Sequence, residues 1–465
     1  MNILALDLGT SSVRGLVLDT DAVPLPGALA RRMVTIELGA DGAATLDGAA
    51  YLAALCECLD ELAEAGRLDG VGLVATAAQW HSVVPLDQAG EPLGPVLTWL
   101  DSRPSPPPGA PAPTDQVAFH HRTGTWWHRF YWNVRLPWLR ERVDHRDLRF
   151  AGLVEYVFGA LLDEAPMSVS QASATGLLDL RTLEWDEEAC GLARVHEGEL
   201  PRLAPKGWRG RLRADHARRW PALRAADWVP PLGDGAASNV GSRAVDTGHA
   251  AVTVGTSAAV RLIQPAPAGE PLPPLPSSLW RYRVDHEHVV TGTAFSGGGN
   301  LYAWADRELR LPQDDDLEKA LTGIPPGGGV RADPRLAGDR PPGLAPAGSG
   351  QLIGLGFNTT AVDIFAGLMS ALCRQVAVGL AEIESTVDRQ VSVILGGGAV
   401  TASPWWRRSF QHALAPREVS YVANPEIGAT GAALVAIGRF AGATGIEPVG
   451  RTDDGTSGVA ADSGR

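Results

Sequence analysis

Residues 3–14 read ILALDLGTSSVR, an apolar strand that enters a Gly-Thr-Ser turn and leaves it as a second strand. Residues 251–261 read AVTVGTSAAVR and repeat the pattern in the other half of the chain. Two such hairpins can face one another across a cleft and offer backbone N–H groups and hydroxyls to a phosphate chain. The copies differ two residues before the glycine, where the first has Asp7 and the second has Thr253. One carboxylate beside a triphosphate can hold Mg²⁺, whereas a second would add repulsion.

The duplication, more than either turn alone, predicts the fold. A single Gly-Thr-Ser turn is more simply explained as a hairpin whose glycine permits a positive φ. Two copies at matching places in a 465-residue chain reverse that preference. The pattern resembles the duplicated, ribonuclease H-like α/β fold of actin, the Hsp70 chaperones and the sugar kinases, in which two domains flank an ATP and substrate cleft. The residues expected to hold ATP here are Gly9, Thr10, Ser11, Gly255, Thr256 and Ser257, with Mg²⁺ at Asp7.

The chain is expected to form two domains and a tail. The N-terminal domain covers residues 1–244 and the C-terminal domain covers 245–446. The tail at 447–465 is poor in apolar residues, which predicts disorder. Apolar spacing predicts strands at 3–8, 13–19, 71–77 and 391–395, and helices near 49–66, 359–387 and 428–441.

Composition limits the classes of function. A net charge of −13 argues against nucleic acid binding. The four cysteines have neither the spacing of a metal site nor that of a disulfide framework. No uninterrupted apolar run approaches the roughly 18 residues that span a bilayer, and we expect no signal peptide before the first strand. We therefore expect a cytoplasmic protein with a small-molecule partner, without nucleic acid or membrane, and a homodimer is left open.

Two further glycine clusters are candidate nucleotide contacts. Gly396, Gly397 and Gly398 follow an apolar strand, and Ser403-Pro404 after them is a helix start with a serine cap. Taken alone, the cluster indicates a tight strand-to-helix turn, but beside two phosphate hairpins it predicts a wall for adenine. Gly298 is expected either beneath the same nucleotide or in a structural loop.

Asp234 is the candidate catalytic carboxylate. It lies between two glycines at the mouth of an expected helix, where an acidic residue is either an N-cap or a reactive group. Its position just ahead of the second hairpin places it toward the same cleft, which favours the reactive role.

A tryptophan-rich stretch predicts a carbohydrate pocket. Six of the fourteen tryptophans fall between residues 80 and 138, whereas a core would use mostly Leu, Ile and Val. Aromatic faces pack on the C–H surface of sugars, and polar neighbours read the hydroxyls. For any one of the polar residues a surface or core role is equally compatible. The residues assigned to the substrate are Gln79, Trp80, His81, Trp99, Asp101, Arg103, His128 and Asp234.

Longer motifs resemble the FGGY carbohydrate kinase family, and most of all its gluconate-kinase-like branch. The resemblance extends from residue 1 to about residue 441. The matching segments are Asp7-Leu8-Gly9-Thr10-Ser11, Trp80-His81-Ser82, Trp99-Leu100-Asp101-Ser102-Arg103, Arg122-Thr123-Gly124-Thr125 with His128, Ala172-Ser173-Ala174-Thr175-Gly176-Leu177, Gly233-Asp234-Gly235, Gly255-Thr256-Ser257 and Gly396-Gly397-Gly398.

The resemblance implies a reaction. It implies ATP-dependent phosphorylation of a sugar or sugar acid hydroxyl, with a gluconate-like acceptor favoured. Asp234 would be the general base and Asp7 would organise Mg-ATP. The carboxylate of an aldonate needs a cation, for which Arg103 and Arg129 are the candidates. Closure of the two domains would use a hinge near 242–248.

Three segments depart from the family pattern. Residues 338–342 replace Gly-Glu-Arg-Ala-Pro with Gly-Asp-Arg-Pro-Pro, 366–371 lack both charges of Arg-Ala-x-x-Glu-Gly, and 130–133 are bulkier than usual. These departures bear on nucleotide affinity and on the identity of the sugar. The alternatives are a xylulose or polyol kinase of the same family, and a degenerate sugar- or nucleotide-binding sensor without efficient transfer. The tryptophan-rich stretch argues against a chaperone or phosphatase of the same fold.

Overall fold

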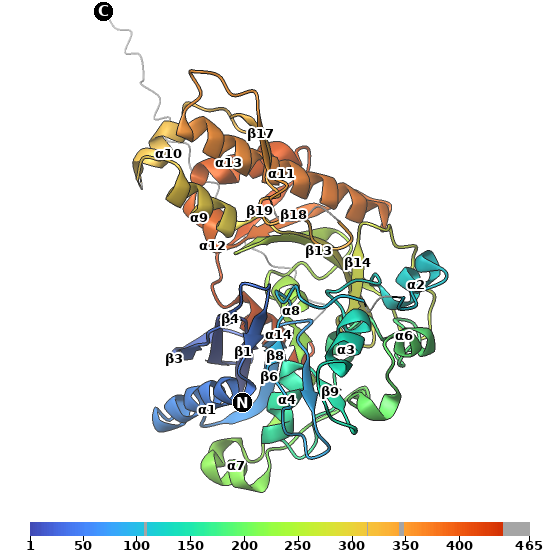
Figure 1. Cartoon of the computed structure of the whole chain (residues 1–465). Helices are drawn as coiled ribbons and strands as arrows, with labels where there is room; N and C mark the ends of the chain where they lie inside the picture. The colour runs from blue at the N-terminus through green and yellow to red at the C-terminus, as the bar shows by residue number, and fades with distance from the viewer. Residues whose placement is uncertain (107–108, 314, 344–347, 440–465) are drawn as a thin grey trace, which may run out of the picture.

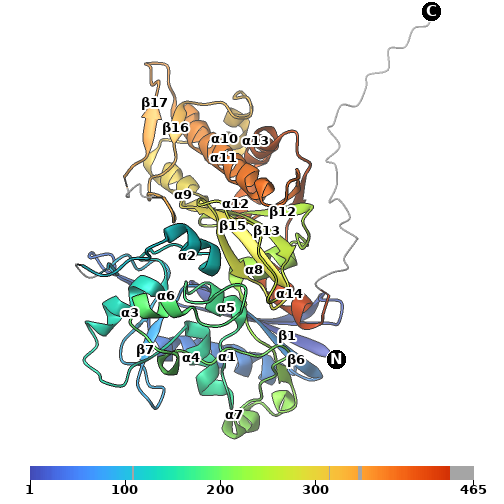
Figure 2. The same ribbon diagram turned by 90° about the vertical axis from the view of Figure 1, so that its right-hand side faces the viewer.

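The protein consists of two α/β lobes, one from each half of the chain (Figure 1). The computed structural model describes residues 1–106, 109–313, 315–343 and 348–439, and the tail expected at 447–465 lies outside the described residues. Figure 2 shows the two lobes from the side, with the last described helix lying against the N-terminal lobe.

The sheet of the N-terminal lobe is built around the first hairpin. Its strands are β10 (Asp227–Trp228), β6 (Val71–Ala78), β1 (Asn2–Leu8), β2 (Ser12–Leu18) and β3 (Pro24–Met33) in spatial order, with β11 (Leu232–Gly233) also paired with β6. β1 is almost wholly apolar because it is buried on both faces. α1 (Gly48–Glu64) begins where Asp47 accepts the N–H groups of Ala49 and Ala50, and it packs its apolar stripe on β2 and β3.

The remainder of the N-terminal lobe surrounds this sheet with short elements. The helices are α2 (Gln116–Thr123), α3 (Trp132–Arg140), α4 (Leu153–Leu161), α5 (Val169–Ser173), α6 (Glu187–Leu192), α7 (Ala214–Arg219) and α8 (Asp234–Gly241), with 3₁₀ turns at Glu197–Glu199 and Pro221–Leu223. The short strands are β4 (Glu37–Leu38), β5 (Ala44–Leu46), β7 (Val84–Leu86), β8 (Val96–Leu97) and β9 (Arg149–Ala151).

The C-terminal lobe repeats the hairpin plan. Its sheet has the order β14 (Trp280–Arg283), β15 (His288–Phe295), β13 (Ala258–Pro265), β12 (His249–Val254), β18 (Ser392–Gly396) and β19 (Val419–Val422). The other elements are α9 (Gly299–Glu308), α10 (Asp315–Leu321), β16 (Arg331–Asp333), β17 (Gln351–Ile353), α11 (Ala361–Ser385), α12 (Gly398–Ala402), α13 (Pro404–Leu414) and α14 (Ile427–Ala436). β12 pairs antiparallel with β13 and parallel with β18, as β1 pairs with β2 and β6, so the two sheets share one pairing pattern around their hairpins.

Two helices join the lobes. α14 is the last described helix, yet it packs on α8 and on strands β1 and β6 of the N-terminal lobe. A Cβ at Gly431 would lie 1.8 Å from the carbonyl oxygen of Ala237, and one at Gly241 would lie 1.9 Å from that of Ile427. Glycine at both positions therefore lets the helix backbones touch. This contact holds the start of α8, which carries Asp234, against the N-terminal sheet.

α11 is a core helix of the C-terminal lobe. The expected helix at 359–387 is confirmed, and Thr360 and Asp363 form its capping box. By length and composition it is the one helix among the described residues that could cross a membrane, but 67% of its apolar window is buried inside the protein. The sequence of α11 contains no uninterrupted apolar run of that length, because polar residues such as Arg374 interrupt it. It packs on β13, β15 and α13.

Candidate active site

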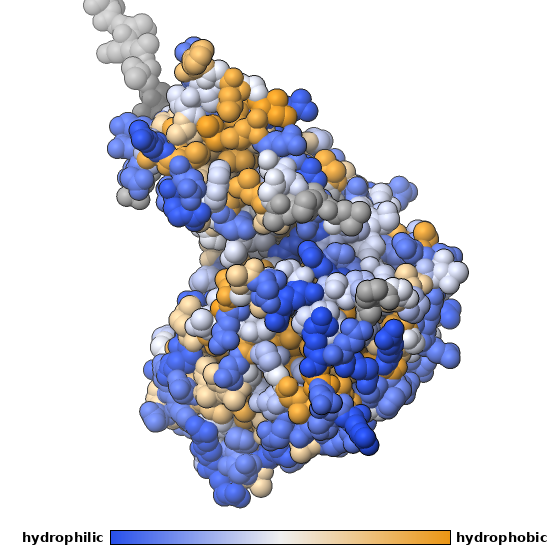
Figure 3. Space-filling model, viewed as in Figure 1, coloured by the Kyte–Doolittle hydropathy of each residue, from blue (hydrophilic) through white to orange (hydrophobic). Residues whose placement is uncertain are grey.

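A cavity of about 210 Å³ lies between the two lobes. Figure 3 shows that the outline of the molecule narrows between the two lobes. Both lobes contribute to its walls, and a site at a domain interface is a common place for a small-molecule substrate. Its lining residues are Thr10, Trp80, His81, Trp99, Phe130, Tyr131, Asp234, Ser257, Ala259, Arg261, Trp280, Tyr282, Ala294, Arg340 and Pro341.

The two hairpins meet at this cavity. Each turn is closed by a backbone hydrogen bond, from Gly9 N to Ser12 O at 3.1 Å and from Gly255 N to Ser257 O at 3.0 Å. Thr10 of the first turn and Ser257 of the second line the same cavity. The two copies of the motif, far apart in the sequence, therefore lie at one site.

Glycine-rich segments pack directly on the second hairpin. Gly299 N donates to Gly255 O at 2.6 Å, and a Cβ at Gly298 would lie 2.6 Å from the carbonyl carbon of Ser257. Gly397 has a φ of 118°, and its Cβ would lie 2.1 Å from the oxygen of Val254. Neither Gly298 nor Gly397 can be replaced without moving the backbone of the hairpin.

The segment that contains Gly396 and Gly398 connects β18 to the helices behind it. Gly396 ends β18 and Gly398 begins α12. The expected helix start is confirmed, since Ser403 Oγ accepts the Trp406 N–H at 3.2 Å and Pro404 opens α13.

Asp234 is the first residue of α8, and Gly233 is the N-cap. Its Oδ1 accepts the N–H of Gly235 at 2.8 Å, and its side chain remains open to the cavity. Loss of hydration in the cleft raises the pKa of Asp234, and the nearby Arg261 guanidinium opposes that rise. A carboxylate with a raised pKa that is open to a cavity is suited to accept a proton.

Both glycines beside Asp234 are needed for close packing on Trp80. A Cβ at Gly233 would lie 1.8 Å from the indole, and one at Gly235 would lie 2.4 Å from it. The indole N–H of Trp80 donates to the oxygen of Ser170 at 3.1 Å, which fixes the ring. The ring therefore supports the turn from which Asp234 projects.

Asp7 lies at the end of β1 beside a cation and a second acid. Arg14 Nη1 is 3.8 Å from Asp7 Oδ2 and 3.0 Å from Glu426 Oε2. Burial raises the pKa of Asp7 to about 6, against the attraction of Arg14, and Asp234 and Glu426 add to the rise. Among the described residues, no group of three His, Cys, Asp or Glu side chains is arranged to hold a metal ion, and Asp7 has Thr253 as its counterpart in the second hairpin.

Aromatic residues line the cavity together with Asp234 and are called here the aromatic wall: Trp80, His81, Trp99, Phe130, Tyr131, Trp280 and Tyr282. His81 Nδ1 lies 2.8 Å from the oxygen of Ala174, so Nδ1 carries the proton and Nε2 is left as an acceptor. Burial lowers the pKa of His81 to about 3, which keeps the ring neutral. Its ring centroid is 4.4 Å from that of Phe130. The hydroxyls of Tyr131 and Tyr282 are 3.0 Å apart, and both residues line the cavity.

Other residues assigned to the substrate lie outside the cavity lining. Gln79 Nε2 donates to Gly9 O at 3.3 Å and so supports the first hairpin. His128 Nδ1 accepts the N–H of Phe130 at 3.1 Å. The buried Asp101 binds Arg103 through both carboxylate oxygens, at 3.0 and 2.6 Å. The structure thus brings Trp80, His81, Trp99 and Asp234 together and places Gln79, Asp101, Arg103 and His128 behind or beside them.

Sequence reasoning missed several lining residues. The aromatic residues Trp280 and Tyr282 come from β14, which carries no motif. Arg261 ends the second copy of the hairpin pattern, and its Nε has no hydrogen-bond partner among the described residues. Arg340 is the arginine that residues 338–342 share with the family pattern Gly-Glu-Arg-Ala-Pro, and this match was the available signal.

Comparison with known proteins decides the family. The description "FGGY family of carbohydrate kinases, N-terminal domain" matches residues 2–241, and "FGGY family of carbohydrate kinases, C-terminal domain" matches residues 250–438. The chain belongs to the FGGY family of carbohydrate kinases. This confirms the resemblance drawn from the motifs.

Individual relatives of this FGGY kinase show how far the similarity reaches. It is 27% identical to a gluconokinase of Bacillus subtilis over 361 residues, which is 73% of this chain and 68% of the relative. A xylulose kinase structure from Lactobacillus acidophilus superposes with a TM-score of 0.82 at 21% identity, covering 94% of this chain and 90% of the other. A gluconate kinase structure from the same organism gives 0.81 at 21% identity, covering 95% and 92%. The structural likeness confirms the expected two-domain fold.

Proposed function

We propose that this carbohydrate kinase transfers the γ-phosphoryl group of ATP to a hydroxyl of a gluconate-like sugar acid, with Asp234 as the general base. The observation that carries the proposal is the position of Asp234, open to a cavity that is lined by residues of both hairpins and by aromatic rings. The similarity to the gluconokinase of Bacillus subtilis supports the choice of acceptor.

The chemistry assigned to Asp234 follows from its surroundings. The acceptor hydroxyl would give its proton to the carboxylate as the oxygen attacks phosphorus. Loss of hydration in the cleft raises the pKa of Asp234, which strengthens it as a base, while Arg261 favours its ionised form. Arg261 is itself partly buried and lines the same cavity.

The residues of the two hairpins fit the phosphates of ATP. The turns at Gly9 and Gly255 both lie at the cavity, and Gly298 and Gly397 have no room for a side chain beside the second turn. Asp7 and Arg14 would lie near the phosphate end, with Asp7 as the oxygen ligand that organises Mg²⁺. Mg²⁺, when bound, would neutralise the charge of the phosphates.

The aromatic wall fits the acceptor. Trp80, Trp99 and Phe130 present apolar faces on which the C–H surface of a sugar can pack. His81 stays neutral and turns a lone pair of Nε2 toward a hydroxyl donor, so it can orient the acceptor without adding charge. A xylulose or polyol acceptor is the alternative, which the 28% identity to a xylulose kinase of Streptomyces rubiginosus supports.

An ADP-release assay tests the proposal. Gluconate, glucitol, xylulose and glycerol are supplied with Mg-ATP to the wild type, to Asp234→Asn and to the control Asp388→Asn, whose carboxylate is exposed. We expect Asp234→Asn to lower kcat about 10²–10⁴-fold while ATP affinity and the circular dichroism spectrum stay unchanged. Near-wild-type turnover in Asp234→Asn would refute the role of the carboxylate. A sensor would release no ADP with any acceptor.

A further inference from the structure

The cavity between the lobes contains one more positive than negative side chain. Its charged lining residues are Asp234, Arg261 and Arg340. Asp234 and Arg261 interact with one another, since Arg261 lowers the pKa of Asp234. In the part of the chain that the structure describes, no carboxylate forms an ion pair with Arg340. A cation held away from bulk water without a counter-charge is costly, and it is stabilised when an anion binds.

The guanidinium of Arg340 spans the two lobes. Its Cζ lies 4.1 Å from the ring centroid of Trp99 and 5.9 Å from that of Phe130, both in the N-terminal lobe. Its Nη2 makes a long hydrogen bond of 3.4 Å to Ser257 Oγ of the second hairpin. Stacking on an aromatic face leaves the edge of the guanidinium, with its N–H donors, free for a planar anion. Burial lowers the pKa of Arg340 to about 10, so the group stays charged at neutral pH.

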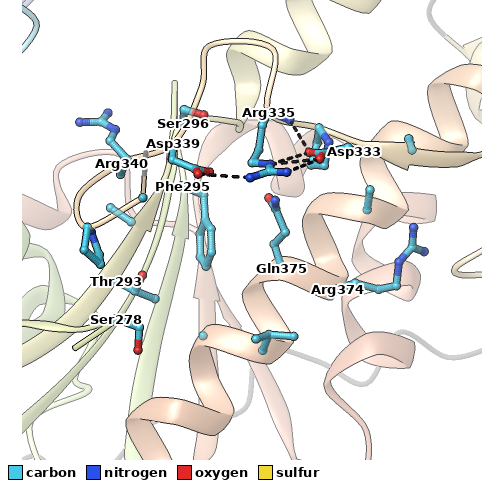
Figure 4. Close-up of a pocket in the computed structure, with 18 of the residues that line it drawn as sticks. Ser278, Thr293, Phe295, Ser296, Asp333, Arg335, Asp339, Arg340, Arg374 and Gln375 are labelled. Atoms are coloured by element: carbon cyan, nitrogen blue, oxygen red, sulfur yellow. Dashed lines mark hydrogen bonds and ion pairs between the residues drawn. The ribbon is translucent and has the colours of Figure 1, made fainter. Parts of the chain in front are cut away.

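The segment behind Arg340 is fixed by an ion-pair cluster. Arg335 donates to Asp333 at 2.6 Å and to Asp339 at 3.2 Å, beside a second cavity of about 680 Å³ (Figure 4). Ser296 Oγ donates to the oxygen of Gly338 on the same segment. Figure 4 shows Arg340 on the far side of Asp339 from Arg335, directed away from this cluster. These contacts fix the backbone next to Arg340, and the side chain of Arg340 points away from the acids of the cluster.

Arg103 and Arg129, which the sequence suggests as cations for the carboxylate of an aldonate, are less suited to bind it than Arg340. Arg103 is paired with both oxygens of the buried Asp101, and it also lies 4.0 Å from Asp41 Oδ2. Arg129 is exposed and donates to the oxygen of Ser102 at 3.4 Å. Neither residue lines the cavity that Asp234 faces.

We propose that Arg340 binds the carboxylate of the acceptor and makes the enzyme specific for sugar acids over neutral sugars. This rests on the proposed function, because it assumes that the acceptor lies between Asp234 and Trp99. A guanidinium can bind a carboxylate through two parallel hydrogen bonds, which reads both charge and orientation. Because Trp99 and Arg340 belong to different lobes, an acid bound there contacts both of them.

The test compares gluconate with glucitol, which has the same chain of hydroxyls and no carboxylate. We measure kcat/KM for both, KM for ATP, and the dissociation constant of gluconate by calorimetry, in the wild type, Arg340→Met, Arg340→Lys and the control Arg103→Gln. We expect Arg340→Met to lower kcat/KM for gluconate about 10²-fold, the usual cost of losing hydrogen bonds to a charged group, and to leave glucitol within about threefold. Arg340→Lys should restore part of the loss, and Arg103→Gln should keep the ranking of the two acceptors.

Several results would overturn the assignment. An equal fall for both acceptors, or a raised KM for ATP alone, would place Arg340 on the donor phosphate. A loss of selectivity in Arg103→Gln would return the carboxylate to Arg103. A wild type that prefers glucitol would refute specificity for acids while the kinase assignment stands. If the wild type phosphorylates neither compound, the proposed function fails, and calorimetry still decides the inference, since gluconate binding that is weaker in Arg340→Met supports it and no binding to the wild type refutes it.

Discussion

Replacing Asp7 with asparagine is expected to stabilise the folded protein at neutral pH while removing the carboxylate that we propose organises Mg²⁺. The pKa of Asp7 is raised from 3.8 to about 6, mainly by burial. A carboxyl group whose pKa is higher in the folded than in the unfolded state opposes folding once it ionises. Its cost appears as the pH rises through about 4 and is complete above about 6. Asparagine has a similar shape and no charge, so it removes this cost.

The size of the effect follows from the pKa change. A pKa that moves from 3.8 to about 6 corresponds to about 3 kcal/mol of opposition to the ionised form. The side chain of Asp7 is 23% exposed, so solvent screening reduces the expected gain to about 1–2 kcal/mol. For the N-terminal lobe this corresponds to a rise in Tm of about 2–8 °C.

The assay is thermal unfolding followed by tryptophan fluorescence, without nucleotide or Mg²⁺, at several pH values between 4.5 and 7.5. Asp7→Asn should exceed the wild type most at pH 7.5, and the difference should shrink steadily toward pH 4.5. Asp388→Asn, at an exposed position, is the matched control and should follow the wild type throughout. An Asp7→Asn protein that is less stable at pH 7.5, or a gain that does not depend on pH, would refute the reasoning.

Three further predictions concern the same cleft. Asp7→Ala should raise the Mg²⁺ concentration for half-maximal activity, and an unchanged Mg²⁺ titration with full turnover would exclude Asp7 as the organiser of the metal. Gly397→Ala should lower Tm and raise KM for ATP because its Cβ would lie 2.1 Å from the oxygen of Val254, whereas the control Gly269→Ala, at a φ of 86° in open space, adds only backbone strain. Activity should fall as pH drops through the raised pKa of Asp234, and Arg261→Gln should move this acid limb to higher pH, as a pH–rate profile measures.

The strands around the first hairpin could be predicted because their signals are local. β1, β2 and β6 were expected at 3–8, 13–19 and 71–77, and the structure places them within one residue of those bounds. An apolar run followed by a glycine turn specifies a hairpin through neighbouring residues alone. The place of α14 is different, because packing on α8 depends on Gly241 and Gly431, which are far apart in the sequence.

The aromatic and charged residues at the cavity could be predicted only in part from the sequence. Asp101 and Arg103 are two residues apart, and their ion pair satisfies a buried carboxylate. The guanidinium of Arg103, which the sequence suggests as a cation for the substrate, is therefore already paired within the protein. Trp280 and Tyr282 carry no motif, yet their ring centroids stack 4.5 Å apart against Trp80. These contacts form only when β14 is brought beside the N-terminal lobe.

The sequence by itself determined the duplicated hairpins, the single carboxylate at Asp7 and the candidate base Asp234, because each depends on residue types within one short segment. Only the tertiary structure decided which cations line the cavity between the lobes. Arg340 meets Trp99 and Ser257 from a different part of the chain, and Arg103 is withdrawn by Asp101. The physical reason is that the charge balance of a cavity is set by which side chains remain unpaired after folding, and that pairing is long-range.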